Sequence, residues 1–497
     1  MQSEQHETLV NTPTPTPTAT SAMPAASDDG DIFYLEKAPL SKAIPHLAVP
    51  LMLGMAATVI YNLTDAFFIG QLDNTSMLSG VTLCLPVMTV LMAIGSLFGV
   101  GGGTEISRLL GENKRDAAKA TASFAFYGSL ALGLLIGALA MLFRAPLINL
   151  LGADANTHGP TSDFATVLFI GAPFMIATFA LEQVVRAEGA AKVSMIGIAM
   201  SAALNIALDP LLIFVFHLDV AGAAIATVLS NVIALGYFVR YLQRKSPTLR
   251  GSLTLFTFTK TTAVNTFKIG VSELLMASLL TATAIVLNNY SASYGESVVA
   301  SFGIAFRVTQ LAEFFAMGLF MGVVPLLAFN YAAKNMPRFI GAIQKTSLYI
   351  GVITVVFCGV CFVFRGTVAG LFSEDANVLA TCSRIMMAML VSALFSGYTG
   401  LFTAIFQATG KAMQATTISI LRGGLFIPVI CLGNHFFGIT GIIWSLTVTE
   451  LLCFSVGGTM MLLLKKEIDG ISATASGTAT LATSSPATAS FMARDCP

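Results

Sequence analysis

Two aspartates that lie in strongly apolar surroundings are the residues of this chain whose types and spacing could do chemistry. Asp65 follows the run YNLT, and Asp209 closes the run NIALD. Because residues four positions apart share a helix face, Asn205 and Asp209 are expected to project from the same side. Pro210 removes one backbone donor and is expected to kink the helix there, which turns carbonyl oxygens toward a cavity.

The composition indicates that most of the chain lies in lipid. Apolar residues make up 55% of the 497 residues and charged residues only 10%, and the mean hydropathy is +0.80. A soluble domain carries roughly 25% charged residues, so this fraction is too low to cover a water-facing surface of that size. The formal net charge of zero argues against a nucleic-acid partner.

The chain divides into twelve predicted membrane spans between Ala43 and Leu464. Each is an apolar stretch of roughly 20 to 30 residues, which is long enough to cross a hydrocarbon core of about 30 Å. The spans are predicted to begin near residues 43, 78, 119, 163, 190, 219, 262, 298, 340, 383, 412 and 438. The fold class is therefore expected to be an all-α membrane protein.

The distribution of basic residues tests this division independently. The terminal segments and the loops after every second span hold most of the 26 Lys and Arg residues, whereas the opposite loops hold only Arg144, Arg365 and Arg384. Because cytoplasmic loops carry the excess of Lys and Arg, both termini are predicted to be cytoplasmic. An error of one span in the division would destroy this alternation between basic and non-basic loops. We expect a multi-pass protein of the inner (plasma) membrane.

An internal repeat indicates that the chain consists of two similar halves. Three glycines of the stretch 80–103, namely Gly80, Gly95 and Gly99, recur as Gly303, Gly318 and Gly322 at a constant offset of 223 residues. In addition, RAEGAAK at 186–192 resembles QATGKAM at 407–413. With six spans in each half, the halves have the same orientation and are related by an axis along the membrane normal. We therefore predict two pseudo-symmetric six-helix lobes around a central cleft, which is a recurring way to build alternating access.

The predicted domain boundaries follow from the spans and the repeat. The ends of the chain are poor in apolar residues, with a TPTPTP run near the start and Ala, Ser and Thr at the end, so both are expected to be disordered cytoplasmic tails. The predicted segments are an N-terminal tail (1–40), an N-lobe (41–245), an inter-lobe linker (246–262), a C-lobe (263–468) and a C-terminal tail (469–497).

The repeat does not duplicate the two aspartates. At the offset of 223 residues Asp65 falls on Asn288, and Asp209 falls near Leu432. An ionisable group at mid-membrane costs about 2.5 to 3.5 kcal/mol, and a poorly hydrated carboxyl group can bind and release protons near neutral pH. The alternative is that each aspartate ties helices together through hydrogen bonds. Ion coupling explains the asymmetry more easily than a shared scaffold does.

Other polar residues of the second half are expected to be mainly structural. Glu273, Arg307, Glu313, Arg422 and Glu450 all fall in predicted spans, where they would form ion pairs between helices or remain near water. Abundant Met and Phe, 22 and 36 residues, would suit an adaptable apolar pocket.

The sequence offers no pattern typical of an enzyme, a cofactor site or a metal centre. The glycine run at 101–103 lacks the Lys of a phosphate-binding loop and lies in a span, so close helix packing explains it better. The five His are scattered, and the spacing of the seven Cys fits neither a zinc site nor a disulfide framework.

Several segments, in this order and spacing, resemble the multidrug and toxic compound extrusion (MATE) family, in particular its bacterial multidrug-exporter branch. The resemblance covers roughly residues 36–468. The matching pieces are Pro50, YNLTDAFFIGQL (61–72), RAEG (186–189), NIALDPLLIF (205–214), GAAIAT (222–227) and PLLAFNYAAKN (325–335).

The resemblance implies a secondary transporter that exports organic, often cationic, compounds in exchange for H+ or Na+. The ion-coupling network of proton-coupled relatives maps to Asp65, Asn205, Asp209 and Thr227. A tyrosine often found in span four is Phe164 here, which alters a network that needs its hydroxyl. The acidic residue that some sodium-coupled relatives use in span ten has no counterpart in 391–407, so a sodium site in the C-lobe is disfavoured.

We therefore expect a proton-coupled antiporter that lies in the lipid bilayer and acts on small organic molecules. It is expected to need no cofactor and to work as a monomer. The alternatives are a flippase for lipid-linked saccharides, which would need a strongly basic cavity, and a non-transporting receptor or scaffold. Further candidates for the substrate cavity are Tyr61, Asn62, Phe164, Glu273, Asn288 and Arg307.

Overall fold

The computed structural model describes residues 31–71, 75–254, 256, 258–370 and 376–483, and within these ranges it contains helices and no strands. The helices of the first half are α1 (Ile32–Glu36), α2 (Leu40–Gly70), α3 (Thr75–Leu83), α4 (Leu85–Gly111), α5 (Arg115–Leu142), α6 (Arg144–Leu150), α7 (His158–Ala187), α8 (Ala191–Pro210), the π-helical turn η1 (Leu211–Val215) and α9 (Asp219–Arg244). Those of the second half are α10 (Lys260–Ala292), α11 (Glu296–Ala332), α12 (Met336–Val363), α13 (Arg365–Gly370), α14 (Ala376–Ala408), α15 (Ala412–Gly424), α16 (Phe426–Phe437) and α17 (Ile439–Thr483).

Twelve of the described segments are long and apolar enough to cross a membrane. Three of these spans consist of two consecutive elements, namely α3 with α4, α8 with η1, and α15 with α16. Each span begins within a few residues of its predicted start. The prediction of an all-helical protein with twelve spans is confirmed.

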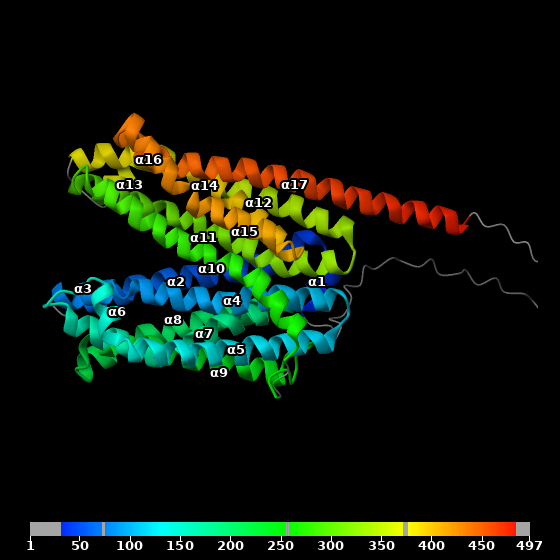
Figure 1. Ribbon diagram of the computed structural model, residues 1–497, viewed down its shortest axis with the longest axis horizontal. Coiled ribbons are helices and arrows are strands. Elements are labelled where there is room, and N and C mark those ends of the chain that lie inside the picture. Colours follow the sequence, from blue (N-terminus) through cyan, green and yellow to red (C-terminus); the bar gives the residue numbers. More distant parts are fainter. Residues whose placement is uncertain (1–30, 72–74, 255, 257, 371–375, 484–497) are drawn as a thin grey trace, which may run out of the picture.

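The helices form two bundles that lie side by side (Figure 1). Helices α2 to α9 make up the N-lobe and α10 to α17 the C-lobe. Each lobe has an apolar cluster of its own, around Phe164 and Ile176 in the N-lobe and around Phe302 and Met386 in the C-lobe. A third, larger cluster contains residues of both lobes, such as Leu47 and Val323, and it joins the lobes at one end.

The lobes contact each other closely at that end, which we call the packed end, because glycines let their backbones meet. A Cβ atom at Gly101 of α4 would collide with the carbonyl oxygen of Thr266 of α10, and one at Gly270 would collide with that of Leu97. Opposite them, a Cβ at Gly322 of α11 would lie 2.8 Å from the Cα of Ala48 of α2. Small residues at such crossings are typical of membrane helices.

The lobes diverge toward the other end, which we call the open end and where α3, α6, α13 and α16 lie (Figure 1). Large apolar side chains of α2 are exposed in this half, with 66% of Leu63 and 60% of Phe67 accessible. The bundle is therefore closed at one end only.

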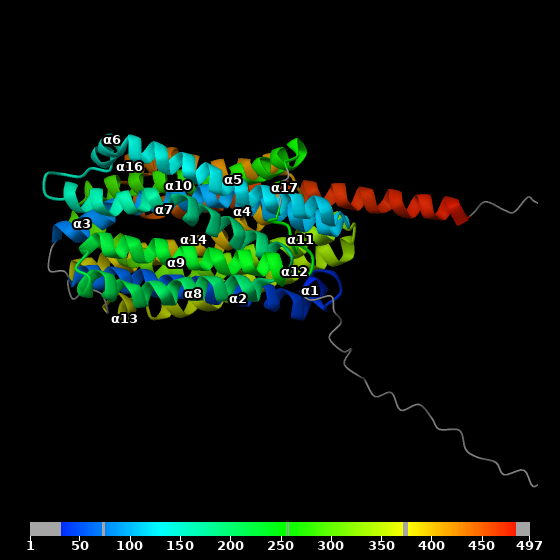
Figure 2. The same cartoon turned by 90° about the horizontal axis from the view of Figure 1, so that it is seen from below.

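The structure differs from the expected tails where it describes them. Residues 1–30 lie outside the described part, but residues 31–40, expected in the disordered tail, include α1 with a completely buried Leu35. Apolar side chains of this short segment pack against the bundle, and that packing orders it. At the other end α17 continues to Thr483, beyond the predicted boundary at 468, and extends past the bundle on the side of α1 (Figure 2). The final residues 484–497 lie outside the described part.

Candidate functional site

A buried polar cluster lies inside the N-lobe between α8 and α9. The side-chain amide of Asn205 donates to Asp209 Oδ1 at 3.4 Å and to Thr227 Oγ1 at 3.3 Å. The Thr227 hydroxyl donates in turn to the carbonyl oxygen of Ala223 at 3.1 Å. All three polar residues are buried, with Asp209 completely inaccessible. The cluster therefore holds a carboxyl group by a fixed amide donor in an apolar helix bundle.

The backbone changes directly after Asp209. Pro210 ends α8, and the following residues form the π-helical turn η1. A proline cannot donate a backbone hydrogen bond, and π-helical turns occur frequently at functional sites. The kink that the sequence predicts at Pro210 thus appears as a widened turn beside the carboxylate.

Two buried oxygen atoms of this cluster accept no hydrogen bond from the described residues, namely Asp209 Oδ2 and Asn205 Oδ1. Buried polar groups are normally hydrogen-bonded, and an unpartnered carboxylate oxygen in an apolar site is costly. A proton or a cation at Asp209 would relieve this cost. The arrangement can therefore act as an ion-binding site.

Asp65 lies on α2, the helix that packs against α8. Its Oδ1 atom is also buried and unpartnered among the described residues, although the residue as a whole is half-buried. Asp65, Asp209 and Tyr61 are close enough for their charges to interact. Two carboxylates that share one site disfavour double ionisation, so the pair is suited to exchange a cation.

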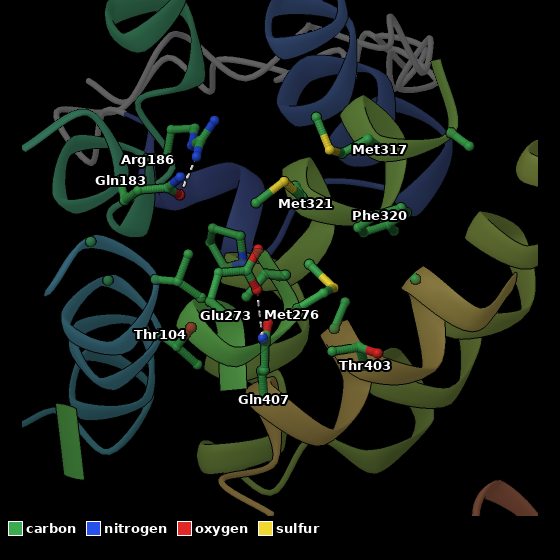
Figure 3. A pocket seen from close by; sticks show the side chains of 18 of the residues that line it. Thr104, Gln183, Arg186, Glu273, Met276, Met317, Phe320, Met321, Thr403 and Gln407 are labelled. Carbon is green, nitrogen blue, oxygen red and sulfur yellow. Dashed lines mark hydrogen bonds between the residues drawn. The ribbon is translucent and has the colours of Figure 1, made fainter. Parts of the chain in front are cut away.

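A central cavity of about 160 Å³ lies between the lobes and extends toward the packed end. Met276, Met317, Met321 and Phe320 form much of its apolar wall, and Glu273 faces the same space (Figure 3). Methionine side chains adapt to irregular ligands. Such a wall suits organic molecules of varied shape.

Two acidic residues of the C-lobe line the cavity. Glu273 of α10 accepts a hydrogen bond from the side-chain amide of Gln407 of α14 at 3.2 Å (Figure 3), and the same amide donates to Ser272 Oγ at 3.2 Å. Glu313 of α11 also lines the cavity and accepts no hydrogen bond from the described residues. Neither carboxylate forms an ion pair with a described residue within 4 Å.

The two arginines that line the cavity are engaged by other side chains. Arg422 of α15 donates from Nε to Glu450 Oε1 at 2.6 Å and also donates to Ser396 Oγ. Arg186 of α7 is paired with Glu182, 3.2 Å from its Nη1, and donates to Gln183 (Figure 3). Among the described residues, both arginines are therefore engaged by neighbouring side chains, whereas Glu273 and Glu313 have no ion-pair partner within 4 Å.

The turn after α7 connects this cavity to the surface at the packed end. Glu188 is completely buried and accepts hydrogen bonds from Ser246 and Thr248 of the inter-lobe linker, each at 2.6 Å. Burial raises the pKa of the Glu188 carboxyl, and these hydrogen bonds lower it in part. The first part of the linker is thereby held against the N-lobe.

The structure brings together three of the four predicted coupling residues, Asn205, Asp209 and Thr227, and it places Asp65 on the neighbouring helix. Of the six further candidates for the cavity, Glu273 alone lines it. Phe164 is 1% exposed and belongs to the apolar core of the N-lobe, because its benzyl side chain packs between helices. Tyr61 lies near Asp65 and Asp209, whereas Asn62, Asn288 and Arg307 are exposed and are not part of this lining.

The expectation that Arg422 forms an ion pair between helices is confirmed by its pair with Glu450. Sequence reasoning missed Gln407 as a cavity residue and placed neither Glu313 nor Arg422 in the cavity. The repeat contained a signal for the first, because Gln407 aligns with Arg186 and both line the cavity. Helical periodicity could not have found the others, since the faces that point to the cavity depend on how the two lobes pack.

Comparison with known proteins agrees with the predicted family. A family model described as MatE matches residues 50–211 and 269–432. The multidrug export protein MepA of Staphylococcus aureus (strain NCTC 8325 / PS 47) is 41% identical over 440 residues, which cover 88% of this chain and 97% of that protein. MepA of Staphylococcus haemolyticus (strain JCSC1435) is 41% identical over 425 residues, or 86% of this chain and 94% of that protein.

Solved structures share the fold. A crystal structure of MATE in complex with MaL6 superposes with a TM-score of 0.81 at 23% identity and covers 88% of this chain and 99% of that chain. A MOP superfamily transporter from Pyrococcus furiosus gives a TM-score of 0.82 at 24% identity and covers 89% and 99%. The two-lobed helical fold that the sequence predicts is confirmed.

Proposed function

We propose that this chain, which belongs to the multidrug and toxic compound extrusion (MATE) family, exports organic cations in exchange for protons. Membership in the family rests on the match to its model and on the relatives that are 41% identical. The chain is accordingly a multi-pass membrane transporter and not an enzyme, as the sequence predicts.

Proton coupling is assigned to the N-lobe cluster, and one observation carries this assignment. Asp209 is completely buried, is held by Asn205, and keeps one carboxylate oxygen without a partner among the described residues. A proton satisfies such an oxygen without further ligands. A sodium ion would need several oxygen donors around it, and the amide nitrogen of Asn205 occupies one side. Asp65, the more accessible carboxylate, would exchange protons with water and pass them to Asp209.

The cavity between the lobes supports an organic cation as the substrate. Glu273 and Glu313 supply negative charge, and the methionine and phenylalanine wall supplies adaptable apolar surface. The relatives named MepA are multidrug export proteins, which agrees with a broad substrate range. A flippase for lipid-linked saccharides is less well supported, since both arginines of the cavity are engaged by neighbouring side chains.

The direction of transport follows from the orientation of the lobes. The basic loops lie at the packed end, so the positive-inside rule assigns this end to the cytoplasm and the open end to the outside. Both termini would then be cytoplasmic, in the plasma membrane. A monomer suffices for alternating access, because one chain contains both lobes. Protonation of the N-lobe carboxylates from outside would favour release of the substrate there.

Transport by the purified protein in liposomes tests this proposal. The vesicles contain a pH-sensitive dye, and ethidium is added under an imposed proton gradient with and without Na+. We expect ethidium-dependent proton flux that does not change when Na+ is removed. Flux that requires Na+ would overturn the assignment of the ion. An absence of flux with any organic cation, in protein shown to be folded, would overturn the assignment of the substrate.

A further inference from the structure

We propose that residues 31–38, which we call the strap, hold the two lobes together at the packed end and must leave the C-lobe before this end can open. The strap consists of α1 and its flanking residues and is continuous with α2 of the N-lobe. This inference rests on the proposed alternation between two lobes, and it assigns a specific segment to the control of that movement.

On the N-lobe side, the strap is held by His46 of α2. The ring of Tyr34 stacks on the His46 ring with centroids 3.5 Å apart and an interplanar angle of 6°, and His46 Nε2 lies 3.3 Å from Asp31 Oδ1. The strap also contacts Gly189, whose φ of +93° and close approach exclude a side chain. A Cβ there would lie 2.7 Å from the carbonyl oxygen of Asp31.

On the C-lobe side, three side-chain hydrogen bonds hold the strap. Asn330 of α11 donates from Nδ2 to the carbonyl oxygen of Leu35 at 2.9 Å. Arg338 of α12 donates from Nε to the same oxygen at 3.2 Å and from Nη2 to that of Tyr34 at 3.0 Å. The last carbonyl groups of a helix have no partner within it, so α1 presents natural acceptors at this end. Leu35 is completely buried in the apolar cluster that joins the lobes.

Because these contacts connect the two lobes, the strap affects the movement that opens the packed end. Its covalent connection to α2 and its contacts with His46 and Gly189 keep it on the N-lobe. When the packed end opens, Asn330 and Arg338 must therefore move away from its carbonyl groups. A few hydrogen bonds and one buried leucine are strong enough to favour the closed form and weak enough to be broken in each cycle.

The strap also lies close to the substrate cavity through the turn that follows α7. Gly189 touches the strap, and Arg186 in the last turn of α7, three residues earlier, lines the cavity. This turn is fixed to α4 by the Ser107 hydroxyl, which donates to the carbonyl oxygen of Ala187 at 2.7 Å. A ligand that shifts Arg186 can thus act on the strap over a short path of bonded residues.

Distance measurements by electron spin resonance test the proposal on the full-length protein. Spin labels are placed at positions 115 on α5 and 413 on α15, which are exposed residues of different lobes at the packed end, in a cysteine-free background that retains transport. Arg338→Ala removes two hydrogen bonds to the strap. We expect the ratio of the longer to the shorter distance to rise about tenfold, because charge-assisted hydrogen bonds contribute an effect of that size.

Two further variants separate the role of the strap from a general loss of structure. Leu35→Ala changes the strap itself by removing the side chain that is buried in the cluster joining the lobes, and it should produce the same shift as Arg338→Ala. Lys345→Ala, at an exposed position of α12 that forms no ion pair with a described residue, should produce no shift. If both strap variants keep the distances of the parent, the proposal is overturned. The distances do not depend on proton coupling, so failure of the proposed function would appear separately, as a parent protein that closes and opens without proton flux.

Discussion

Asp209 and Asp65 differ in their access to water, and under the proposed mechanism this difference gives each a separate task. Asp209 is completely buried and held by the amide of Asn205, whereas Asp65 on α2 is half-buried. A buried carboxyl group that must gain and lose a proton needs a neighbour that reaches water. The side-chain amide of Asn205 matters because it fixes the orientation of the Asp209 carboxylate. It donates a hydrogen bond to this carboxylate as long as one of the carboxylate oxygens is free to accept it.

Replacement of Asn205 tests this positioning role. Asn205→Ala leaves both carboxylates in place but removes the donor that fixes Asp209, so we expect proton-coupled ethidium transport in liposomes to fall about tenfold, as the loss of a hydrogen bond to a charged group predicts. The control is Asn231→Ala on α9, which removes an amide that donates only to a backbone carbonyl oxygen. Equal activity of the two variants would show that Asn205 has no special role.

The residues proposed for coupling were identified from the sequence, whereas most of the residues that line the cavity were not. Asn205 and Asp209 are four positions apart on one helix, and the family resemblance supplied Thr227 as their partner. Glu313 and Gln407 line the cavity because of the angle at which α11 and α14 pack against the N-lobe. A single sequence contains no direct signal of that angle, and the prediction for Phe164 missed its burial in the core for the same reason.

At the scale of the elements, an ion pair between α15 and α17 organises the C-lobe. The side chains of Arg422 and Glu450 are 14% and 11% exposed, and Ser396 of α14 accepts a further hydrogen bond from the same guanidinium. The guanidinium group of Arg422 thus connects α14, α15 and α17. This pair lies in the C-lobe half of the repeat, where the N-lobe has Thr227 at the position that corresponds to Glu450.

Breaking this pair should destabilise the protein strongly. Arg422→Met leaves Glu450 buried without its partner, which costs about 3 to 5 kcal/mol, and thermal unfolding in detergent measures the loss. The double variant Arg422→Met with Glu450→Leu should recover most of it, since no uncompensated charge remains. Arg384→Met, at an exposed arginine that forms no ion pair with a described residue, serves as the control. Normal stability of the single Arg422 variant would contradict the structural role.

The glycines at the lobe interface should matter for closure of the packed end. Gly270→Val places a side chain against the backbone of α4 at Leu97, so we expect the inter-lobe distance between labels on α5 and α15 to increase and transport to be lost. Gly359→Val on α12, where a Cβ would meet nothing within 4 Å, should keep both. Unchanged distances in the Gly270 variant would mean that closure of the packed end does not depend on the contact between Gly270 and α4.

The helices that the length of an apolar run determines were predicted well, and those that depend on packing against distant parts of the chain were predicted poorly. The twelve spans follow from apolar runs that are too long to be loops. Pro210 marks the change from α8 to the π-helical turn. Helix α1 has only five residues, too few for a periodic signal, and a tail rich in polar residues precedes it. Its order comes from Leu35 and from the hydrogen bonds of Asn330 and Arg338, which lie about 300 positions further along the chain.

At the scale of the whole molecule, the two halves share a fold but divide the work. The N-lobe contains Asp65 and Asp209, and the C-lobe contributes both acidic residues of the cavity. The lobes meet along glycine-rich crossings, and the strap spans them at the packed end. Ion binding in one lobe can therefore change the affinity for a substrate between the lobes only by changing how the lobes pack. In the proposed mechanism, this dependence couples the two fluxes.

The most direct test of this coupling compares Asp209→Asn with the matched control Asp163→Asn, an exposed residue at the open end. Both proteins are reconstituted in liposomes with a pH-sensitive dye inside, and ethidium movement is measured with and without a proton gradient. We predict that the control behaves like the parent, whereas Asp209→Asn still binds ethidium but neither responds to the gradient nor moves protons. Gradient-driven ethidium transport with normal proton flux in the Asp209 variant would contradict the account.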